Sequence, residues 1–341
     1  MKKLMMLWLV LMFLGVVGNA EVVNMPDLSR PDSIAVDDQD IVITDGIHIY
    51  VYSQKDRKLR VKMGGKAGEG PQEFLPSPAP WIPAIRVYLK PDQFFVSGIN
   101  KMLRFERSGK YIDEFRPIIP RSQYIPLEKK YVVIWFAEDK RHYITYSLYD
   151  SNKKLEKELL RMKSLDQDGK TIDPIAAGMA KSYFSRQVHG NHIFLISDDE
   201  NIHVFNATGQ KTATINPPYE KISLTAKDIE VFDQFFRKDL RFKEIYVLDH
   251  ARVKYPSSYP LRKEYRVAQD RVYVISNKKK DTQYETFIYD FSGKLQKRMF
   301  LPLKDADPLE LYPFAIHHNR IYQLIENDDE EIWQLHITEI K

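Results

Sequence analysis

The sequence predicts an all-β protein, a six-bladed β-propeller closed by its N-terminal strand, with a helical insertion between blades four and five. Three observations carry this prediction. A buried central strand recurs six times, an outer hairpin recurs five times, and a spare extended segment precedes the first repeat. Radial repetition of small antiparallel sheets is the arrangement that such a pattern indicates.

Residues 1–20 have the pattern of a signal peptide. Lys2 and Lys3 form a basic start, Leu4 to Val17 form an apolar core, and Ala20 ends a small-residue exit. The apolar run is shorter than the roughly 20 residues needed to span a bilayer, so cleavage is expected and not anchoring. We therefore predict a secreted or periplasmic protein whose folded domain is residues 21–341, with no membrane span after cleavage.

Six short runs combine a polar turn with a strand rich in β-branched and aromatic residues. They begin at Asp40, Asp92, Lys130, Asn191, Asp270 and Asn319. Each is predicted to be the central strand of one blade.

Five of these runs are followed by an outer hairpin, in which two alternating segments flank a polar turn. The hairpins begin at Tyr50, Leu103, Ser147, His203 and Phe287. Three of the turns contain a glycine, at Gly109, Gly209 and Gly293, where a positive φ is expected.

The sixth blade lacks its last strand, because the chain ends after Trp333 to Ile337 and the residues that follow it. The segment Glu21 to Met25 is predicted to supply that strand. Closing the ring in this way leaves few exposed strand edges.

The helical insertion is predicted within residues 216–261. Ile229, Phe232, Phe236 and Leu240 share one helical face, and Thr225 is followed three residues later by an acidic side chain, which is a helix-start signal. The helix is expected to cover blade surface, with an interaction element as the alternative, because apolar helix faces normally pack on their own domain.

The segment Gly64 to Phe74 lies between one blade's outer strand and the next blade's inner strand. At Gly65, Gly68, Gly70, Pro71, Glu73 and Phe74 it resembles the motif that connects successive blades in the NHL-type six-bladed propellers. More narrowly, it resembles that of secreted bacterial six-bladed propellers of undefined function. The resemblance implies a fold and no reaction, because such propellers include ligand sensors, scaffolds, lyases and lactonases.

Composition excludes several functions. The chain has no cysteine, so disulfides, thiol catalysis and cysteine-bound metal are excluded. The net charge is +4, and +2 without Lys2 and Lys3, which gives no basis for a nucleic-acid partner. No hydrolase motif of the GxSxG or HExxH type is present, so we assign no catalytic residue and no cofactor.

Histidines occur in two turns that follow inner strands, at His189 and His192 and at His317 and His318. A zinc site needs three or four converging ligands, and the equivalent positions of the other blades do not supply a ring of them. We therefore interpret these histidines as surface turn residues and predict no metal site.

Candidate binding residues lie near the starts of the inner strands, at the mouth of the central channel. Aromatic rings give rigid contact area and arginine gives bidentate hydrogen bonds, which suits sugars, peptides or acidic groups. Blade-to-blade packing is the alternative role for the aromatic residues. The candidates are Trp81, Tyr124, Tyr183, Tyr312, Arg121, Arg186 and Arg262.

The hypothesis from sequence is a non-catalytic secreted or periplasmic binding or protein-interaction module. Its partner would be a small ligand, a glycan, a peptide or an envelope protein. The alternative is a metal-dependent propeller enzyme of the lyase or lactonase type. Any ligand site is expected on the face that carries the three long connections, Gly64 to Pro83, Arg161 to Ser182 and Asn216 to Leu261.

Overall fold

The computed structural model describes residues 20–76, 83–119, 122–136, 143–163, 186–239 and 253–341, together with Asp173, Ile175, Lys243 and Tyr246. The predicted signal peptide, apart from Ala20, lies outside these residues and stays a prediction. In the part of the chain that is described, no helix is both long and apolar enough to cross a bilayer.

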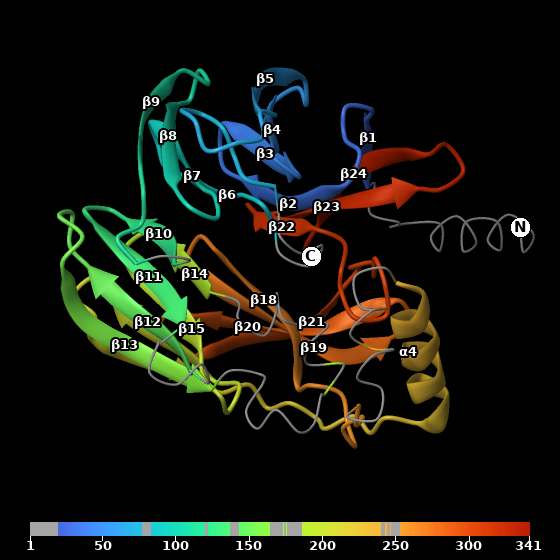
Figure 1. The fold of residues 1–341 in the computed structure, drawn as a ribbon. Helices are drawn as coiled ribbons and strands as arrows, with labels where there is room; N and C mark the ends of the chain where they lie inside the picture. The colour runs from blue at the N-terminus through green and yellow to red at the C-terminus, as the bar shows by residue number, and fades with distance from the viewer. Residues whose placement is uncertain are drawn as a thin grey trace, which may run out of the picture.

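Six four-stranded antiparallel sheets form the blades (Figure 1). Blade one consists of β2 (Pro31–Val36), β3 (Asp40–Asp45), β4 (His48–Ser53) and β5 (Leu59–Gly64). Blade two consists of β6 (Arg86–Leu89), β7 (Gln93–Ser97), β8 (Met102–Glu106) and β9 (Tyr111–Phe115). Blade three consists of β10 (Gln123–Leu127), β11 (Lys130–Phe136), β12 (Tyr143–Tyr149) and β13 (Leu155–Lys163). Blade four consists of β14 (Arg186–His189), β15 (His192–Ile196), β16 (Ile202–Asn206) and β17 (Lys211–Ile215). Blade five consists of β18 (Arg262–Ala268), β19 (Arg271–Lys280), β20 (Gln283–Asp290) and β21 (Leu295–Leu301). Blade six consists of β22 (Phe314–His317), β23 (Arg320–Asn327), β24 (Ile332–Glu339) and β1 (Glu21–Met25).

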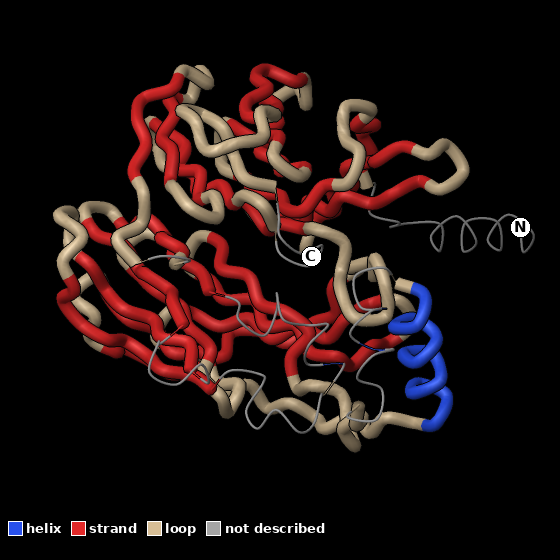
Figure 2. Tube along the Cα trace, in the orientation of Figure 1, coloured by secondary structure: helices blue, strands red, loops and turns tan. Residues whose placement is uncertain are grey.

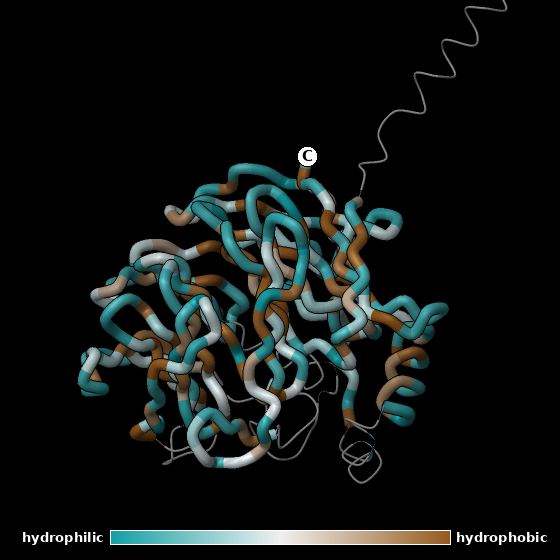
Figure 3. The backbone as a smooth tube through the Cα atoms, turned by 90° about the horizontal axis from the view of Figure 1, so that it is seen from above, coloured by the Kyte–Doolittle hydropathy of each residue, from teal (hydrophilic) through white to brown (hydrophobic). Residues whose placement is uncertain are grey.

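These sheets confirm the predicted six-bladed propeller. The six predicted central strands are β3, β7, β11, β15, β19 and β23, and the five predicted outer hairpins join the last two strands of blades one to five. Gly109, Gly209 and Gly293 adopt φ of 87°, 73° and 84° in the turns where a positive φ was expected. Hydrophilic stretches, teal in Figure 3, alternate with hydrophobic ones, brown, along the backbone.

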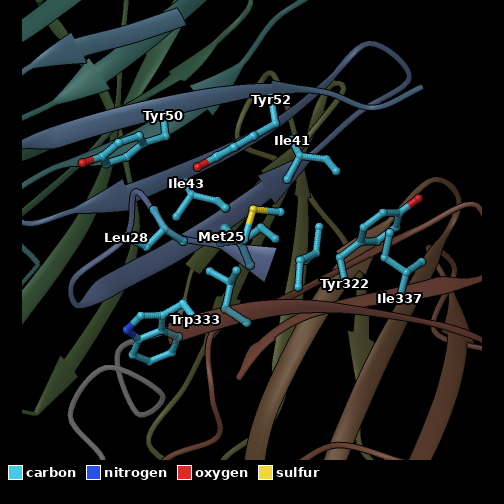
Figure 4. Close-up of a cluster of buried hydrophobic side chains, with 12 residues drawn as sticks. Met25, Leu28, Ile41, Ile43, Tyr50, Tyr52, Tyr322, Trp333 and Ile337 are labelled. Carbon is cyan, nitrogen blue, oxygen red and sulfur yellow. The ribbon is translucent and has the colours of Figure 1, made fainter. Parts of the chain in front are cut away.

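The N-terminal strand closes the ring as predicted. β1 pairs antiparallel with β24, from Glu21 opposite Ile337 to Met25 opposite Trp333. Met25 is 1% exposed and packs between blades one and six (Figure 4). The Trp333 indole Nε1 donates to the Ser29 carbonyl at 3.0 Å, which ties β24 to the chain that leaves β1. We call this contact between blades one and six the closure seam.

The core consists of one apolar cluster for each pair of neighbouring blades. The closure seam is one such cluster, and the other five join blades one and two, two and three, three and four, four and five, and five and six. Each cluster is built from inward residues of two facing sheets, because side chains alternate between the two faces of a strand. Stability therefore comes from contacts between blades more than from any single blade.

The Gly64–Phe74 segment is a compact turn that seals the core between blades one and two. Phe74 is 1% exposed and belongs to that apolar cluster. The Gly68 amide donates to the Phe74 carbonyl at 3.1 Å, and the Gly70 amide donates to Glu73 Oε2 at 2.8 Å. The motif noted in the sequence thus places an aromatic plug next to a self-bonded glycine loop.

One α-helix, α4 (Ala226–Lys238), lies outside the six sheets in the described part of the chain (Figures 1 and 2). Thr225 caps it, and Thr225 and Asp228 form the reciprocal bonds of a capping box. Phe232 and Phe236 are buried as predicted, whereas Leu240 lies outside the described residues.

The helix was expected to cover blade surface, but among the described residues its apolar face packs on other connecting segments and not on the strands of a blade. Its cluster includes Ile175 from the connection between blades three and four and Leu309 from the connection that leads into β22. The helix is thus part of a second small core, built from the long connections, on one face of the ring.

Candidate functional site

A cavity of about 650 Å³ opens on the face that carries the long connections. Its walls come from the starts of the inner strands β2, β6, β18 and β22, from the connection that precedes β22, and from the end of α4. The inner strands line the central channel, so the cavity is at the channel mouth. Its size is in the range of sites for small molecules.

Arg86, the first residue of β6, is the unusual group in this cavity. Its buried Nε atom has no hydrogen-bond partner among the described residues. The pKa of Arg86 is lowered to about 10, mainly by burial and then by the nearby cations Arg186 and Arg266, against the opposing effect of Glu264. An arginine held near other arginines without a carboxylate of its own is an unfavourable arrangement that a bound anion would relieve.

Two other cations of the cavity are already paired. Arg266 forms an ion pair with Glu264 at 3.0 Å, donates to the Phe314 carbonyl at 3.2 Å and stacks over the Phe314 ring. Lys263 is buried and lies 3.4 Å from an Asp305 carboxylate oxygen. These two side chains are held in place and Arg30, the fourth cation of the wall, is exposed. Among the described residues of the wall, Arg86 is therefore the cation with a buried atom left for a ligand to bind.

A second buried polar atom lies close to Arg86 and Arg186. The Tyr146 hydroxyl of blade three has no hydrogen-bond partner among the described residues. Burial raises the pKa of Tyr146 to about 12, and the charges of Arg186 and Arg86 oppose that rise. The channel next to the cavity therefore contains polar groups for which the described strands and turns supply no hydrogen-bond partner.

The remaining walls are aromatic and acidic. Tyr312 is half-buried and packs edge-on against Trp333, with ring centroids 5.8 Å apart, and Phe235 of α4 also faces the cavity. The acidic side chains are Asp32, Asp239, Glu264, Asp307, Glu310 and Glu326. A wall of this mixed charge suits a polar ligand with one acidic group better than a polyanion.

Four of the seven binding residues predicted from sequence are described. Tyr312 lines the cavity, and Arg186 lies close enough to Arg86 to affect its pKa. Tyr124 is 1% exposed in the core between blades two and three, where its ring meets Phe115 edge-on. Arg262 is buried and its guanidinium lies 3.8 Å from Glu200.

Tyr124 therefore packs between blades two and three, which is the alternative role considered for the aromatic residues. Arg262 of blade five forms an ion pair with Glu200 of blade four. Trp81, Arg121 and Tyr183 lie outside the described residues.

Sequence reasoning missed Arg86. Arg186 and Arg262 were chosen because they lie at the start of an inner strand, and Arg86 has the same position in blade two. The rule that found those two arginines would have found the third. What the sequence does not contain is the pairing: Arg262 has a carboxylate partner in the structure, whereas Arg86 has none among the described residues.

The histidine turns lie at the other ends of the inner strands, away from the cavity. His189 ends β14 and His317 ends β22. Burial lowers the pKa of His189, and the nearby His192 and Lys90 lower it further. One feature was not expected: Asp38, in the turn after β2, contacts both His317 and His318.

The cavity and the six sheets define a β-propeller with a polar site at its channel mouth. No protein-family model matches the chain, and no curated protein matches it in sequence.

Solved structures of similar fold include the Neurospora crassa Pan2 WD40 domain (9% identity, TM-score 0.45, covering 94% of this chain and 94% of that one). A luciferin-regenerating enzyme is similar at 10% identity and a TM-score of 0.44, covering 94% of this chain and 96% of that one. BamB from Moraxella catarrhalis matches at 8% identity and a TM-score of 0.33, covering 89% of this chain and 71% of that one.

Proposed function

We propose that this protein is a non-catalytic binding module of the secreted or periplasmic space, which holds a polar ligand with an acidic group at the mouth of its channel. The observation that carries the proposal is Arg86, whose buried Nε faces no partner among the described residues in a cavity of about 650 Å³. The signal-peptide pattern of residues 1–20 supports the compartment.

The ligand is of small-molecule or peptide size. A carboxylate, or a similar planar anion, would accept two hydrogen bonds from the Arg86 guanidinium and restore an ordinary charge balance. Tyr312 and Phe235 would supply flat contact area. The acidic walls would accept hydrogen bonds from hydroxyl or amino groups of the same ligand.

The test compares ligands that differ only in the acidic group. D-Glucuronate against D-glucose, and a short peptide with a free C-terminus against its amide, are added to the purified protein in thermal-shift and calorimetric titrations. The acidic member of at least one pair should raise the melting temperature, and Arg86→Gln should abolish the rise. Arg116→Gln is the matched control, because Arg116 is an exposed arginine of the same blade.

Arg86 should also affect the stability of the protein in the absence of any ligand. A cation whose pKa is depressed in the folded protein destabilises the fold at every pH below that pKa, and the penalty disappears as the pH rises above about 10. Arg86→Gln should therefore increase the free energy of unfolding at pH 7, by about 1–3 kcal/mol. Equal responses to acidic and neutral ligands, or a destabilised Arg86→Gln protein, would show that Arg86 is structural and contradict the proposal.

A further inference from the structure

The closure seam brings together three side chains that are metal ligands by type. Asp38 lies in the turn between β2 and β3 of blade one, and His317 and His318 lie at the turn between β22 and β23 of blade six. Asp38 Oδ1 is 2.9 Å from His317 Nε2 and 2.6 Å from His318 Nε2. All three ligand atoms lie within 4.8 Å of one another.

This spacing is close to that of a bound divalent transition metal. With bonds of about 2.0–2.2 Å to histidine nitrogen and carboxylate oxygen, ligand atoms around a tetrahedral Zn²⁺ are separated by about 3.3 Å. The two observed separations need to widen by less than about 1 Å, and the side chains have room to do so. The side chains of Asp38 and His318 are 74% and 63% exposed, whereas that of His317 is 13% exposed and fixed by its strand.

A fourth side chain orients one of the histidines. The Gln269 side-chain Nε2 is 2.7 Å from His318 Nδ1, and Gln269 lies in the turn between β18 and β19 of blade five. A metal-binding histidine commonly bonds its second ring nitrogen to a neighbouring polar group, which fixes the ring and its tautomer. A glutamine amide serves either tautomer, because rotation of the amide exchanges its oxygen and nitrogen.

We propose that Asp38, His317 and His318 form a binding site for a divalent transition-metal ion, with Zn²⁺ as the natural probe, and that the bound ion clamps blade one to blade six. The apolar seam cluster already joins the two blades, and the ion would add a polar link between their turns. The site lies at the opposite end of the inner strands from the cavity, so it is independent of ligand binding there. Its consequence is structural: an ion shared by both blades stabilises the closed ring.

The test is calorimetric titration of the chelator-treated protein with zinc chloride alone. The expected result is one Zn²⁺ per chain and an increase in melting temperature, since a ligand bound only to the folded state stabilises it. His317→Ala and Asp38→Ala should each remove both effects. Gln269→Ala should retain binding but weaken it by roughly tenfold or more, as loss of an orienting partner does.

The matched control is the double variant His189→Ala, His192→Ala. These two histidines flank a turn at the same mouth in blade four, near Phe291, and among the described residues no acidic ligand joins them. Their removal should leave zinc binding and the thermal shift unchanged. Zinc binding that survives Asp38→Ala, or that falls equally in the control, would mean unspecific binding to surface histidines and would overturn the proposal. Circular dichroism confirms that each variant is folded.

Discussion

Two glycines of blade one show how differently a turn can constrain a residue. Gly64 ends β5 with φ of 74°, and a Cβ there would lie 2.3 Å from the Ile47 carbonyl oxygen. Gly46 also has a positive φ, of 59°, but a Cβ there meets no atom within 4 Å. The two glycines share a backbone conformation and differ in the space around them.

That difference gives a prediction at the scale of a residue. Gly46→Ala should cost about 1–2 kcal/mol, which is the penalty of a left-handed backbone for alanine. Gly64→Ala carries the same penalty and forces a backbone oxygen to move as well, so its cost should be larger by a further ~1–3 kcal/mol. Urea denaturation of the two variants measures the difference. Equal destabilisation would show that the β5 turn relaxes freely.

Residues of the two proposed sites were only partly predictable. Tyr312 and Arg186 were identified from their position at the start of inner strands, and that signal reflects the geometry of any propeller. The partnership of Asp38 with His317 was not, because it joins turns that are 279 residues apart in the chain. Which side chains converge across a ring depends on its closure, and a local pattern contains no information about that.

At the scale of elements, α4 shows how a local signal and a long-range contact combine. Its start was predicted from Thr225, and the structure shows why: the Thr225 amide donates to Asp228 Oδ2 at 2.8 Å, while the Asp228 amide donates to Thr225 Oγ1 at 3.2 Å. Its apolar face was also predicted. Its partners were not, since they come from other connecting segments.

The helix therefore depends on its second small core. Phe236 is 1% exposed and stacks on Tyr246, with ring centroids 5.5 Å apart. Phe236→Ala should cost about 3 kcal/mol of local stability and speed hydrogen exchange in the helix. Val231→Ala is the control, because Val231 is 45% exposed. If Phe236→Ala leaves exchange unchanged but abolishes binding of a partner, the helix is an interaction element.

The strands were predicted more fully than the connections between them. Alternation with period two recurs in each blade and a turn glycine in three of them, so an error in one blade is corrected by the others. The connections have no such repetition. The loop from Gly64 to Phe74 was recognised from sequence. Its role in sealing the core between blades one and two follows only from the structure, where Phe74 packs into that core.

At the scale of the whole molecule, stability depends on closing the ring. Removal of Glu21 to Met25 leaves β24 as an open edge and removes Met25 from the seam cluster. This deletion should lower the melting temperature markedly and promote aggregation, since an unpaired edge recruits other strands. A deletion variant as stable and as soluble as the parent would show that another segment closes the blade.

A point variant tests the same feature without shortening the chain. Met25→Ala should cost about 2–4 kcal/mol, because the side chain is 1% exposed in the seam cluster. Val22→Ala, in the same strand, should change stability by less than about 0.5 kcal/mol, because Val22 is 47% exposed.

The register of β1 on β24 has a topological consequence. Glu21 lies opposite Ile337, so the first strand starts beside the place where the last strand finishes. A short peptide joining the two ends would turn β24 and β1 into an ordinary outer hairpin like those of blades one to five. The chain could then be opened at any exposed turn of another blade with all six sheets retained. Blade six is built from both ends of the chain only because the two ends of the folded domain lie within that blade.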